Sequence, residues 1–506
     1  MSPAASESPS SAVVIGAGVA GMSAALILAM RGWKVTLVEK AARPGATMRG
    51  FSRKGVYFES GLHIAGELSD HGLLRTYLRY LGLDTLDFAD FDADAFETFC
   101  FGDGSSFSVP IGYESYREAL QKAFSGERDG IAAFLAEVRA AYDASQLHNF
   151  RGPFSLSGER EARWLGPLDT FLDRYVSEPR LRDILTAPGW LYGVAPDQSS
   201  FLLHARVAGS HFDSVRTFKG GGLALVQAFE NRLREAGVTV LCNSGVSRIL
   251  LSAASGPVGV ELENGGRVEG KLVIHTGHPS SLVDMLPEGA VRPAYANRLR
   301  GLKDSISAHL LFFTAGGRPE RLRRRNLYVY PADASFAGMF RPGTPTSRGP
   351  FYLLASPQAQ ESEGGEASTT AVTAFTLTDA GEYRRFYGEK RGRRSADYAA
   401  LKQERLGRMS EALAEACPEV SDMTLLDGAT PLTLRDWLGT PDAGVYGAAH
   451  TIHQFNPAPV TRVPGVYLAG QGVVAPGLMG ALVSAFLVCG IIVGHESLVD
   501  EVMACR

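Results

Sequence analysis

The stretch AVVIGAGVAGMSAALILAMRGWKVTLVE, residues 12–39, carries the strongest structural signal in this chain. An apolar run of strand length leads into Gly16, Gly18 and Gly21, a small-residue run of helical length, and a second apolar run that ends at Glu39. Gly16 permits a tight turn, Gly18 lets the backbone approach a pyrophosphate, and Gly21 lets the helix pack closely on the sheet. In this order of strand, helix and strand, the glycines predict a doubly wound α/β domain that binds a dinucleotide.

Glu39 indicates which dinucleotides fit. It lies about 20 residues beyond the glycines, where a carboxylate can accept both ribose hydroxyls and would repel a 2'-phosphate, which favours FAD or NAD over NADP. No second glycine motif of this kind follows a strand, so we do not expect a separate nicotinamide domain. The sequence does not distinguish whether the substrate, a quinone, oxygen or a reductase exchanges electrons with the cofactor.

Two further segments favour FAD. Residues 43–66, RPGATMRGFSRKGVYFESGLHIAG, predict a glycine-bearing loop, a short strand around Val56–Glu59 and a turn that carries His63. Residues 464–490, PGVYLAGQGVVAPGLMGALVSAFLVCG, predict a strand ending at Gly470 and then an apolar helix. The N-terminus of that helix can stabilise the negative charge of a reduced flavin, although the stretch alone could also be a core helix.

The FAD-binding Rossmann-type domain is expected to be discontinuous and to comprise residues 11–84, 213–290 and 441–500. Its middle piece, 219–275, predicts a helix at about 223–235 and strands that join the same sheet. Residues 85–212 and 295–440 predict an intertwined α+β substrate domain, a mixed sheet covered by helices. Residues 1–10 predict a flexible tail.

Composition restricts the partners. The 506 residues carry a net charge of -4 and are 45% hydrophobic, which is typical of a globular protein and does not favour nucleic acid. Five scattered cysteines with no metal-ligand spacing indicate a reduced, cytoplasmic compartment. The apolar run 477–494 predicts a buried helix rather than a membrane span. An arginine cluster at 318–325 could hold lipid phosphates in a peripheral membrane contact, or it could be a solvated face.

The sequence resembles the FAD-dependent phytoene desaturase, carotenoid isomerase and retinol saturase family. The resemblance is carried by SGLHIAG (60–66), TPLTLRDWLGTPDAGVYGAAHTIHQFNP (430–457) and PGVYLAGQGVVAPGLMGALVSAFLV (464–488), and it is greatest to retinol saturase-like proteins. It implies an FAD enzyme that acts on C–C or C=C bonds of a long apolar, often polyunsaturated substrate. Where the family usually has a pair of glycines in the loop after Glu39, this chain has Gly45 and Ala46.

The resemblance also implies which residues touch the cofactor. Val246 would present its backbone to the adenine, although it could equally be a plain sheet residue. The other expected cofactor residues lie in or next to the segments quoted above: Gly16, Gly18, Gly21, Glu39, Lys40, Gly45, Arg49, Gly61, Gly470, Gln471, Gly477, Leu478 and Met479.

Hydride transfer to or from carbon also needs a group that handles a proton. His63, Tyr446 and His450 lie in segments that resemble flavin-facing ones, and each could instead be structural. We expect an oxidoreductase that saturates or desaturates a carotenoid-, retinoid- or isoprenoid-like substrate. The alternatives are an amine-oxidase-type flavin oxidase, a redox-neutral cis-trans isomerase and, more remotely, a non-catalytic lipid-binding protein.

Overall fold

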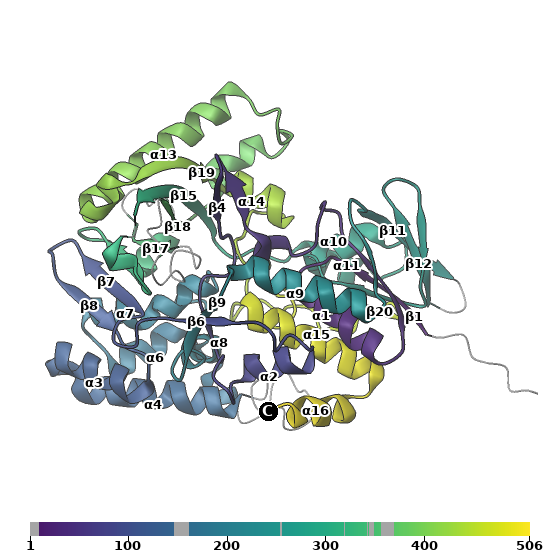
Figure 1. Ribbon diagram of the computed structural model, residues 1–506, viewed down its shortest axis with the longest axis horizontal. Helices are drawn as coiled ribbons and strands as arrows, with labels where there is room; N and C mark the ends of the chain where they lie inside the picture. The colour runs from purple at the N-terminus through teal and green to yellow at the C-terminus, as the bar shows by residue number, and fades with distance from the viewer. Residues whose placement is uncertain are drawn as a thin grey trace, which may run out of the picture.

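The structure is a computed structural model that describes residues 10–145, 161–252, 256–317, 319–341, 343, 349–355 and 369–506. One part is built on a five-stranded parallel sheet with the order β10-β2-β1-β14-β20 (Figure 1). Its strands are β1 (Ser11–Ile15), β2 (Lys34–Val38), β10 (Thr239–Leu241), β14 (Leu272–His275) and β20 (Val466–Leu468). The sheet therefore draws its strands from segments far apart in the chain.

The winding of this sheet reverses at β1. β1 pairs in parallel with β2 on one side, to which α1 (Val19–Met30) connects it, and with β14 on the other. In an open parallel sheet such a reversal leaves a crevice at the carboxyl ends of the strands, where ligands bind. The doubly wound α/β architecture predicted from residues 12–39 is confirmed.

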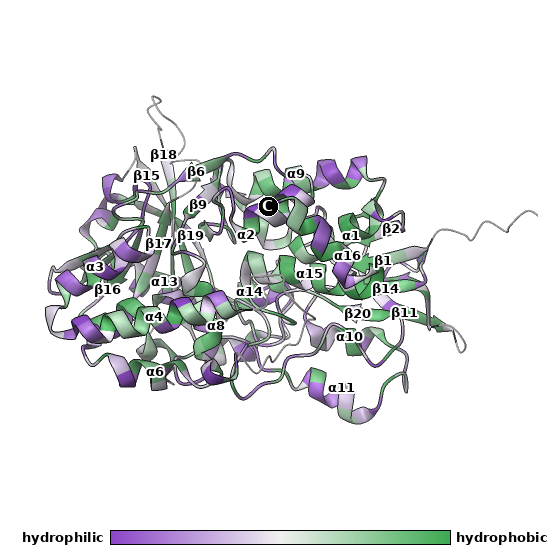
Figure 2. Cartoon of the chain, turned by 90° about the horizontal axis from the view of Figure 1, so that it is seen from below, coloured by the Kyte–Doolittle hydropathy of each residue, from purple (hydrophilic) through white to green (hydrophobic). Residues whose placement is uncertain are grey.

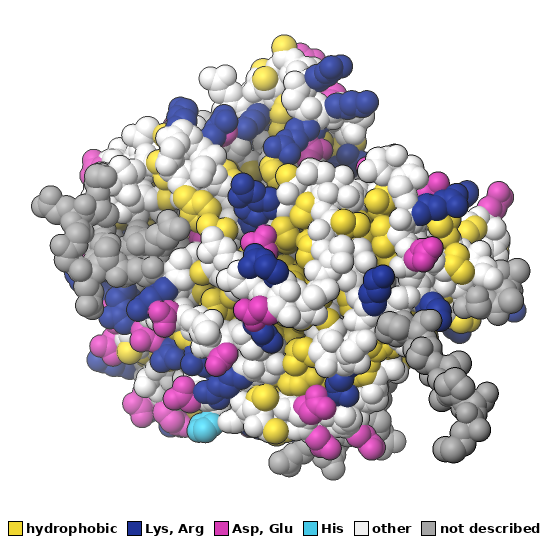
Figure 3. All heavy atoms as spheres, turned by 45° about the vertical axis from the view of Figure 1, so that its right-hand side comes forward, with side chains coloured by type: hydrophobic (Ala, Val, Ile, Leu, Met, Phe, Trp, Pro, Cys, Tyr) yellow, Lys and Arg dark blue, Asp and Glu magenta, His cyan; other side chains and the backbone are white. Residues whose placement is uncertain are grey.

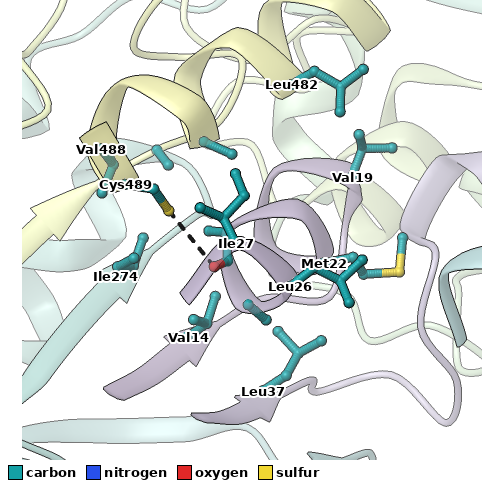
Figure 4. Close-up of a cluster of buried hydrophobic side chains, with 14 of the residues drawn as sticks. Val14, Val19, Met22, Leu26, Ile27, Leu37, Ile274, Leu482, Val488 and Cys489 are labelled. Atoms are coloured by element: carbon teal, nitrogen blue, oxygen red, sulfur yellow. Dashed lines mark hydrogen bonds between the residues drawn. The ribbon is translucent and has the colours of Figure 1, made fainter. Parts of the chain in front are cut away.

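Helices α1 and α15 (Gly477–Val493) form the apolar centre of this part. Both are hydrophobic on all sides, and both are almost entirely green in the hydropathy view of Figure 2, which is the pattern of a buried helix. They pack against each other and the strands beneath, and the Cys489 thiol lies 3.7 Å from the Ala24 carbonyl oxygen (Figure 4). The buried helix predicted for 477–494 is confirmed; among the described residues, no helix is long and apolar enough to span a bilayer.

A seven-stranded mixed sheet, β19-β15-β18-β17-β16-β7-β8, lies on the other side of the molecule (Figure 1). Neighbouring strands are antiparallel except for β7 and β16. The strands are β7 (Glu97–Phe101), β8 (Ser106–Val109), β15 (Ser307–Gly316), β16 (Asn326–Tyr330), β17 (Phe351–Ala355), β18 (Thr369–Thr378) and β19 (Thr424–Ala429).

Helices cover both faces of the mixed sheet. Strand alternation sends Phe99 into a core shared with the larger helical group, and Cys100 into a core shared with α13 (Ala396–Ala416). Figure 1 shows α13 at the top and the larger group at the lower left. That group contains α3 (Tyr113–Ala123), α4 (Arg128–Ala144), α6 (Leu168–Tyr175), α7 (Pro179–Thr186) and α8 (Phe201–Gly209). The predicted mixed sheet covered by helices is confirmed.

Small sheets and helices connect the two parts. The small sheets are β3 (Phe51–Arg53) with β4 (Val56–Phe58), β5 (Ala65–Gly66) and β6 (Phe88–Asp90) on either side of β9 (Val215–Phe218), and β11 (Val246–Ser252), β12 (Gly256–Leu262) and β13 (Arg267–Glu269). The remaining α-helices are α2 (Leu73–Tyr80), α9 (Gly221–Glu235), α10 (Pro279–Met285), α11 (Pro293–Arg300), α14 (Pro431–Leu438) and α16 (His495–Ala504).

One prediction needs correction. The segment 219–275 adds only β10 and β14 to the parallel sheet, because β11, β12 and β13 form an antiparallel sheet of their own. The predicted strand 56–59 ends one residue early, at Phe58.

All five cysteines are free thiols. The predicted tail, 1–10, lies outside the described residues except for Ser10.

The arginine cluster is largely committed to protein contacts. Arg321 pairs with Glu419 at 2.6 Å, Arg325 pairs with Asp92, and Arg324 donates to the carbonyl oxygens of Asp90 and Phe91 at 2.8 and 3.0 Å. Arg318 lies outside the described residues. Figure 3 shows cationic and anionic side chains interspersed over one face of the molecule. These contacts favour the structural interpretation of the cluster over a site for lipid phosphates.

Candidate flavin site

The three predicted glycines have distinct surroundings at the end of β1. Gly16 has a φ of +100°, and a side chain there would meet the Thr276 hydroxyl at 2.6 Å. A side chain at Gly21 would lie 1.8 Å from the Gly16 carbonyl oxygen, so the helix approaches the turn as closely as glycine allows. At Gly18, by contrast, the nearest atom is the Ala46 methyl at 3.8 Å. The first N–H groups of α1 therefore open onto the crevice, where they can bind a phosphate.

Glu39 follows β2 directly and is buried. Its two oxygens accept the backbone N–H groups of Ala17 and Ala41 at 2.7 and 2.8 Å, which fixes the carboxylate beside the glycine turn. A carboxylate has about four acceptor positions, so two remain for ribose hydroxyls. An open cavity of about 620 Å³ adjoins this region, and its lining includes Arg43, Arg49 and Cys242.

The loop after Glu39 contains the departure noted in the sequence. Gly45 has a φ of +108°, and its N–H donates to the Ala17 carbonyl at 2.8 Å, which ties the loop to the glycine turn. Ala46 has a φ of +45°, so it keeps the left-handed backbone that a glycine would adopt easily. The loop therefore contains a left-handed backbone conformation at a residue that is not glycine.

A second helix N-terminus lies at the same edge of the sheet. β20 is parallel to β14, so the loop that follows β20 emerges at the carboxyl end. Gly470 has a φ of +104° and donates its N–H to the Ser484 hydroxyl at 2.7 Å, while a side chain there would come within 2.9 Å of the Thr276 carbonyl. Gly477 begins α15, and a side chain there would meet no described atom within 4 Å. The start of α15 is accessible to a ligand.

The remaining predicted cofactor residues are less diagnostic. Lys40 is exposed beyond Glu39, and Arg49 lines the open cavity while its carbonyl accepts the Tyr57 hydroxyl at 2.6 Å. Val246 is buried at an irregular start of β11. Three others lie in the segments already described: Gly61 packs against Thr47, and Leu478 and Met479 pack on the core of the parallel sheet.

This set of groups fits FAD. The turn at Gly18 and the start of α15 supply N–H donors and positive helix ends, and Glu39 supplies a fixed acceptor beside the glycine turn. The glycines leave the room that a dinucleotide backbone needs, since only small or absent side chains face the crevice at positions 18 and 477. Within the described ranges, no group of three His, Cys, Asp or Glu side chains could hold a metal ion.

Two of the three catalytic candidates have structural partners. The Tyr446 hydroxyl donates to the Trp190 carbonyl at 2.6 Å, and burial raises the pKa of Tyr446 well above its ordinary value. His450 bonds the Gln471 carbonyl at 2.7 Å, and burial lowers the pKa of His450 to about 4. His450 therefore holds the loop between β20 and α15, and neither side chain presents an uncommitted group for proton transfer.

His63 differs from the other two candidates. Its Nδ1 is buried and has no hydrogen-bond partner among the described residues. Burial lowers the pKa of His63 to about 4, so the ring is neutral at physiological pH. It follows the loop of 43–61, and Gly61 beside it packs on Thr47 of that loop. His63 is the candidate whose side chain remains available.

The structure adds two features that the sequence analysis did not identify. The Thr276 hydroxyl lies 2.9 and 3.1 Å from the carbonyl oxygens of Ile15 and Gly16, which joins the ends of β14 and β1. As the first polar residue after an apolar strand, it could have been found. His278 and Asp304 form a buried pair at 3.0 Å, with Asp304 also accepting the Asp442 N–H. No local pattern links these three positions.

Comparison with known proteins agrees with this geometry. A family model described as flavin containing amine oxidoreductase matches residues 19–493. The chain is 26% identical over 531 aligned residues to all-trans-retinol 13,14-reductase from Danio rerio, covering 96% of this chain and 86% of the relative. It is 25% identical over 516 residues to hydroxyneurosporene desaturase from Rubrivivax gelatinosus, covering 96% and 93%.

A solved structure gives the same fold. Wild-type putrescine oxidase bound to putrescine superposes with a TM-score of 0.64 at 16% identity, covering 96% of this chain and 99% of the other. At this identity the likeness speaks for the fold alone. The sequence resemblance to FAD-dependent oxidoreductases is confirmed by the family match, which spans almost the whole chain. The chain therefore belongs to the flavin-containing amine oxidoreductase family, as an FAD-dependent oxidoreductase.

Proposed function

We propose that this chain is a polyene saturase, an enzyme that adds hydrogen across a C=C bond of a long apolar substrate. The observation that carries the proposal is a cavity with mostly apolar walls between the mixed sheet and its helices. Most of its lining is aromatic or aliphatic, including Phe96, Phe99, Phe134, Leu185 and Phe212. Apolar walls of this kind suit a hydrocarbon chain, because burial of each CH₂ group stabilises binding by about 0.8 kcal/mol.

The relatives support the same class of reaction. One is named for the reduction of all-trans-retinol and another for the desaturation of hydroxyneurosporene, and both align with nearly all of this chain. Saturation and desaturation are opposite directions of one hydrogen transfer at a carbon–carbon bond. We therefore assign this chain that transfer and treat its direction as the quantity to be measured.

The residues of the crevice would hold the cofactor. Gly18 and the start of α15 would bind through backbone N–H groups, and Glu39 would accept the ribose hydroxyls. When bound there, FAD would supply the capacity for hydride transfer, a chemistry that the side chains themselves lack. We propose that His63 handles the accompanying proton. As a neutral imidazole it carries one N–H and one acceptor nitrogen, so it can release a proton while accepting another.

Tyr446 and His450 have positioning roles in this proposal. Their contacts with the carbonyls of Trp190 and Gln471 keep the segment 446–471 in place beside the start of α15. Putrescine oxidase shares the fold, but at 16% identity this likeness gives no information on the substrate and does not favour the amine-oxidase alternative. The nearly apolar cavity favours a hydrocarbon over a small diamine.

The test is anaerobic reoxidation of the dithionite-reduced holoenzyme. Separate samples receive all-trans-retinol, a carotene, a quinone and an amine, and the recovery of the oxidised flavin spectrum is followed. We expect the polyenes to reoxidise the flavin. Reoxidation by quinone alone, with hydrogen removal from a polyene in the oxidised enzyme, would reverse the direction to desaturation. Reduction of the oxidised enzyme by the amine alone would replace the proposal with an amine oxidase.

A further inference from the structure

The cavity under the mixed sheet contains one acidic side chain, Glu97. Strand β7 places Glu97 on the same face as Phe99, so it points toward the helices rather than toward α13. The residue is 9% exposed and lines the cavity. A carboxyl group at this depth is costly to bury unless its oxygens are hydrogen-bonded.

The hydrogen bonds of Glu97 are unevenly distributed. The hydroxyls of Tyr352 and Tyr328 both donate to Oε1, at 2.5 and 3.2 Å, and the Asn326 amide donates to the Tyr352 hydroxyl at 3.1 Å. No described residue bonds to Oε2. The stacking of Tyr328 on Tyr352, with ring centroids 4.1 Å apart, holds the two donors in place. One oxygen is fixed by protein, and the other remains for a ligand.

Glu161 is a buried carboxyl group with a structural role, and its hydrogen bonds differ from those of Glu97. Glu161 is 1% exposed, and both of its oxygens accept Arg206 at 3.1 and 3.2 Å. Among the described residues, no Lys or Arg pairs with Glu97 and none bonds to its second oxygen. Oε2 of Glu97 therefore has an acceptor position available on the cavity side. A ligand that donates a hydrogen bond to Oε2 would complete the hydrogen bonding of this carboxyl group.

We infer that Glu97 is the polar anchor of the substrate cavity and that it selects apolar ligands that end in a hydroxyl group. The inference rests on the proposed function and extends it from a hydrocarbon to a polyene alcohol. The hydroxyl would donate to Oε2, while the chain would lie against aromatic and aliphatic walls. An ammonium end would be recognised less well, because the mostly apolar walls make the loss of its hydration far more costly than that of a hydroxyl.

Titration of Glu97 offers a test without mutation. Burial raises the pKa of Glu97 to about 7, partly offset by the hydrogen bonds from Tyr352 and Tyr328. Above this pH the carboxylate only accepts hydrogen bonds, whereas below it the acid also carries a proton that it can donate. A preference for an alcohol over its methyl ether should therefore exist at pH 8 and decrease at pH 6.

Burial shifts the other titratable groups around the cavity toward their neutral forms. Burial raises the pKa of Tyr116, Tyr328 and Tyr352 above the ordinary value, so the phenols stay protonated. Burial lowers the pKa of His204 to about 3, so this ring stays neutral, and burial also lowers the pKa of His211. Among the described residues that line the cavity, Glu97 is the carboxyl group, and its pKa lies between pH 6 and 8.

The experiment measures binding to the oxidised holoenzyme by quenching of tryptophan fluorescence. The probes are all-trans-retinol, its methyl ether and the matched amine, at pH 8 and pH 6. We expect retinol to bind more tightly than the ether at pH 8, on the order of tenfold. Glu97→Gln should bind alcohol and ether alike at both values of pH, since its amide can donate to either oxygen.

Asp183 provides the matched control. Burial raises its pKa to about 7 as well, and it accepts the Phe336 N–H at 2.8 Å, but it does not line the cavity. Asp183→Asn should keep the preference for retinol. Equal binding of alcohol and ether by the wild type at pH 8, tighter binding of the amine, or a preference that survives Glu97→Gln would overturn the inference. If Glu97→Gln does not fold, the wild-type comparison at two values of pH decides.

Failure here is distinguishable from failure of the proposed function. If retinol binds through Glu97 but never reoxidises the reduced flavin, the role of Glu97 would stand and the saturase activity would be refuted. Polyenes that reoxidise the flavin without any preference for the alcohol would do the opposite.

Discussion

At the residue scale, Ala46 is a non-glycine residue with a left-handed backbone, at a position where the resemblance predicts glycine. Its φ of +45° is a left-handed value that costs a non-glycine residue about 1–2 kcal/mol. Its methyl group is the nearest atom to the space beside Gly18. The resemblance predicted a departure here, and the structure shows that the strain is borne by the backbone of one residue.

We expect Ala46→Gly to raise the free energy of unfolding by about 1 kcal/mol, because glycine adopts this conformation without the steric penalty. The measurement is the melting temperature of the holoenzyme. Ala400→Gly on the exposed face of α13 is the control, and it should lower stability by about 1 kcal/mol. A decrease at both positions would show that the left-handed strain at Ala46 is not significant.

His63 makes a second prediction at this scale. His63→Gln should slow hydrogen transfer by about 10²-fold or more while leaving the FAD content unchanged, since an amide cannot relay a proton. The rate is the single-turnover reoxidation of reduced flavin by substrate. Because the pKa of His63 is about 4, the wild-type rate should show no inflection near pH 6.5 from this group. His71→Gln, at an exposed histidine, should behave as wild type; an unchanged rate in His63→Gln would exclude the role.

The residue roles were only partly predictable. The surroundings of Gly16, Gly18 and Gly21 follow from the local motif, because a strand, a turn and a helix of one segment create them. The partners of Tyr446 and His450 are carbonyls of Trp190 and Gln471, which the chain brings near only on folding. Sequence reasoning could name these two side chains as polar groups near the cofactor, but not their partners.

At the element scale, the close contact of α1 with the turn before it is the most sensitive feature. Gly21→Ala would place a methyl group 1.8 Å from the Gly16 carbonyl, so the helix must move away from the sheet. We expect a loss of stability of several kcal/mol and loss of FAD, measured by thermal melting and by the ratio of flavin to protein absorbance. Wild-type FAD content in Gly21→Ala would refute the assigned geometry.

Gly407 in α13 is the matched control for that experiment. It lies inside a helix, and a side chain there would meet no described atom within 4 Å. Gly407→Ala should therefore raise stability by about 0.5–1 kcal/mol, through the helix propensity of alanine, and leave FAD content unchanged. The two substitutions are chemically identical and are expected to have opposite signs.

Helices and strands with strong local sequence patterns could be predicted. Which strands join the parallel sheet could not be predicted from those patterns. The helix expected at about 223–235 is α9 (Gly221–Glu235), and β10 and β14 were expected as strands. β11 to β13 form their own sheet because successive strands pair through short turns, whereas β10 and β14 reach the parallel sheet through helices and loops. Strand pattern alone does not distinguish these outcomes.

At the scale of the whole molecule, buried titratable groups set the response to pH. Burial lowers the pKa of five histidines to about 3 or 4: His63, His204, His275, His309 and His450. Burial raises the pKa of three carboxyl groups to about 7: Glu59, Glu97 and Asp183. Near pH 5.5 the histidines take up protons on unfolding and the carboxyl groups release them, which leaves a net uptake of about two protons.

The direction in which stability changes with pH follows from the excess of buried histidines over buried carboxyl groups. The folded-state pKa values of the histidines lie below 6.5, so the unfolded chain binds more protons between about pH 4 and 6.5, and stability falls as the pH falls through this window. The carboxyl groups oppose this change between about pH 4.5 and 7, where their contribution falls as the pH rises. We expect the melting temperature of the holoenzyme to decrease from pH 6.5 to 4.5. A melting temperature that rises over this interval would contradict the predicted charge states.

The cavity belongs to this scale because no single segment forms it. Its lining runs from Ile64 to Tyr328 and includes strands of the mixed sheet and the helices that cover it. The alternating pattern of ETFCF at 97–101 places Glu97 on the same face as the inward-pointing Phe99, so its orientation could have been predicted from the sequence. The donors Tyr328 and Tyr352 come from two other strands, so the anchor could be described only once the sheet order was known.

The most direct test of the central claim is the product of one anaerobic turnover. Holoenzyme reduced by one equivalent of dithionite per flavin is mixed with all-trans-retinol, and the product is analysed by mass spectrometry. The account predicts one product molecule per flavin oxidised, heavier than the substrate by two hydrogens. A product of unchanged mass with the flavin still reduced would contradict it and make the chain an isomerase.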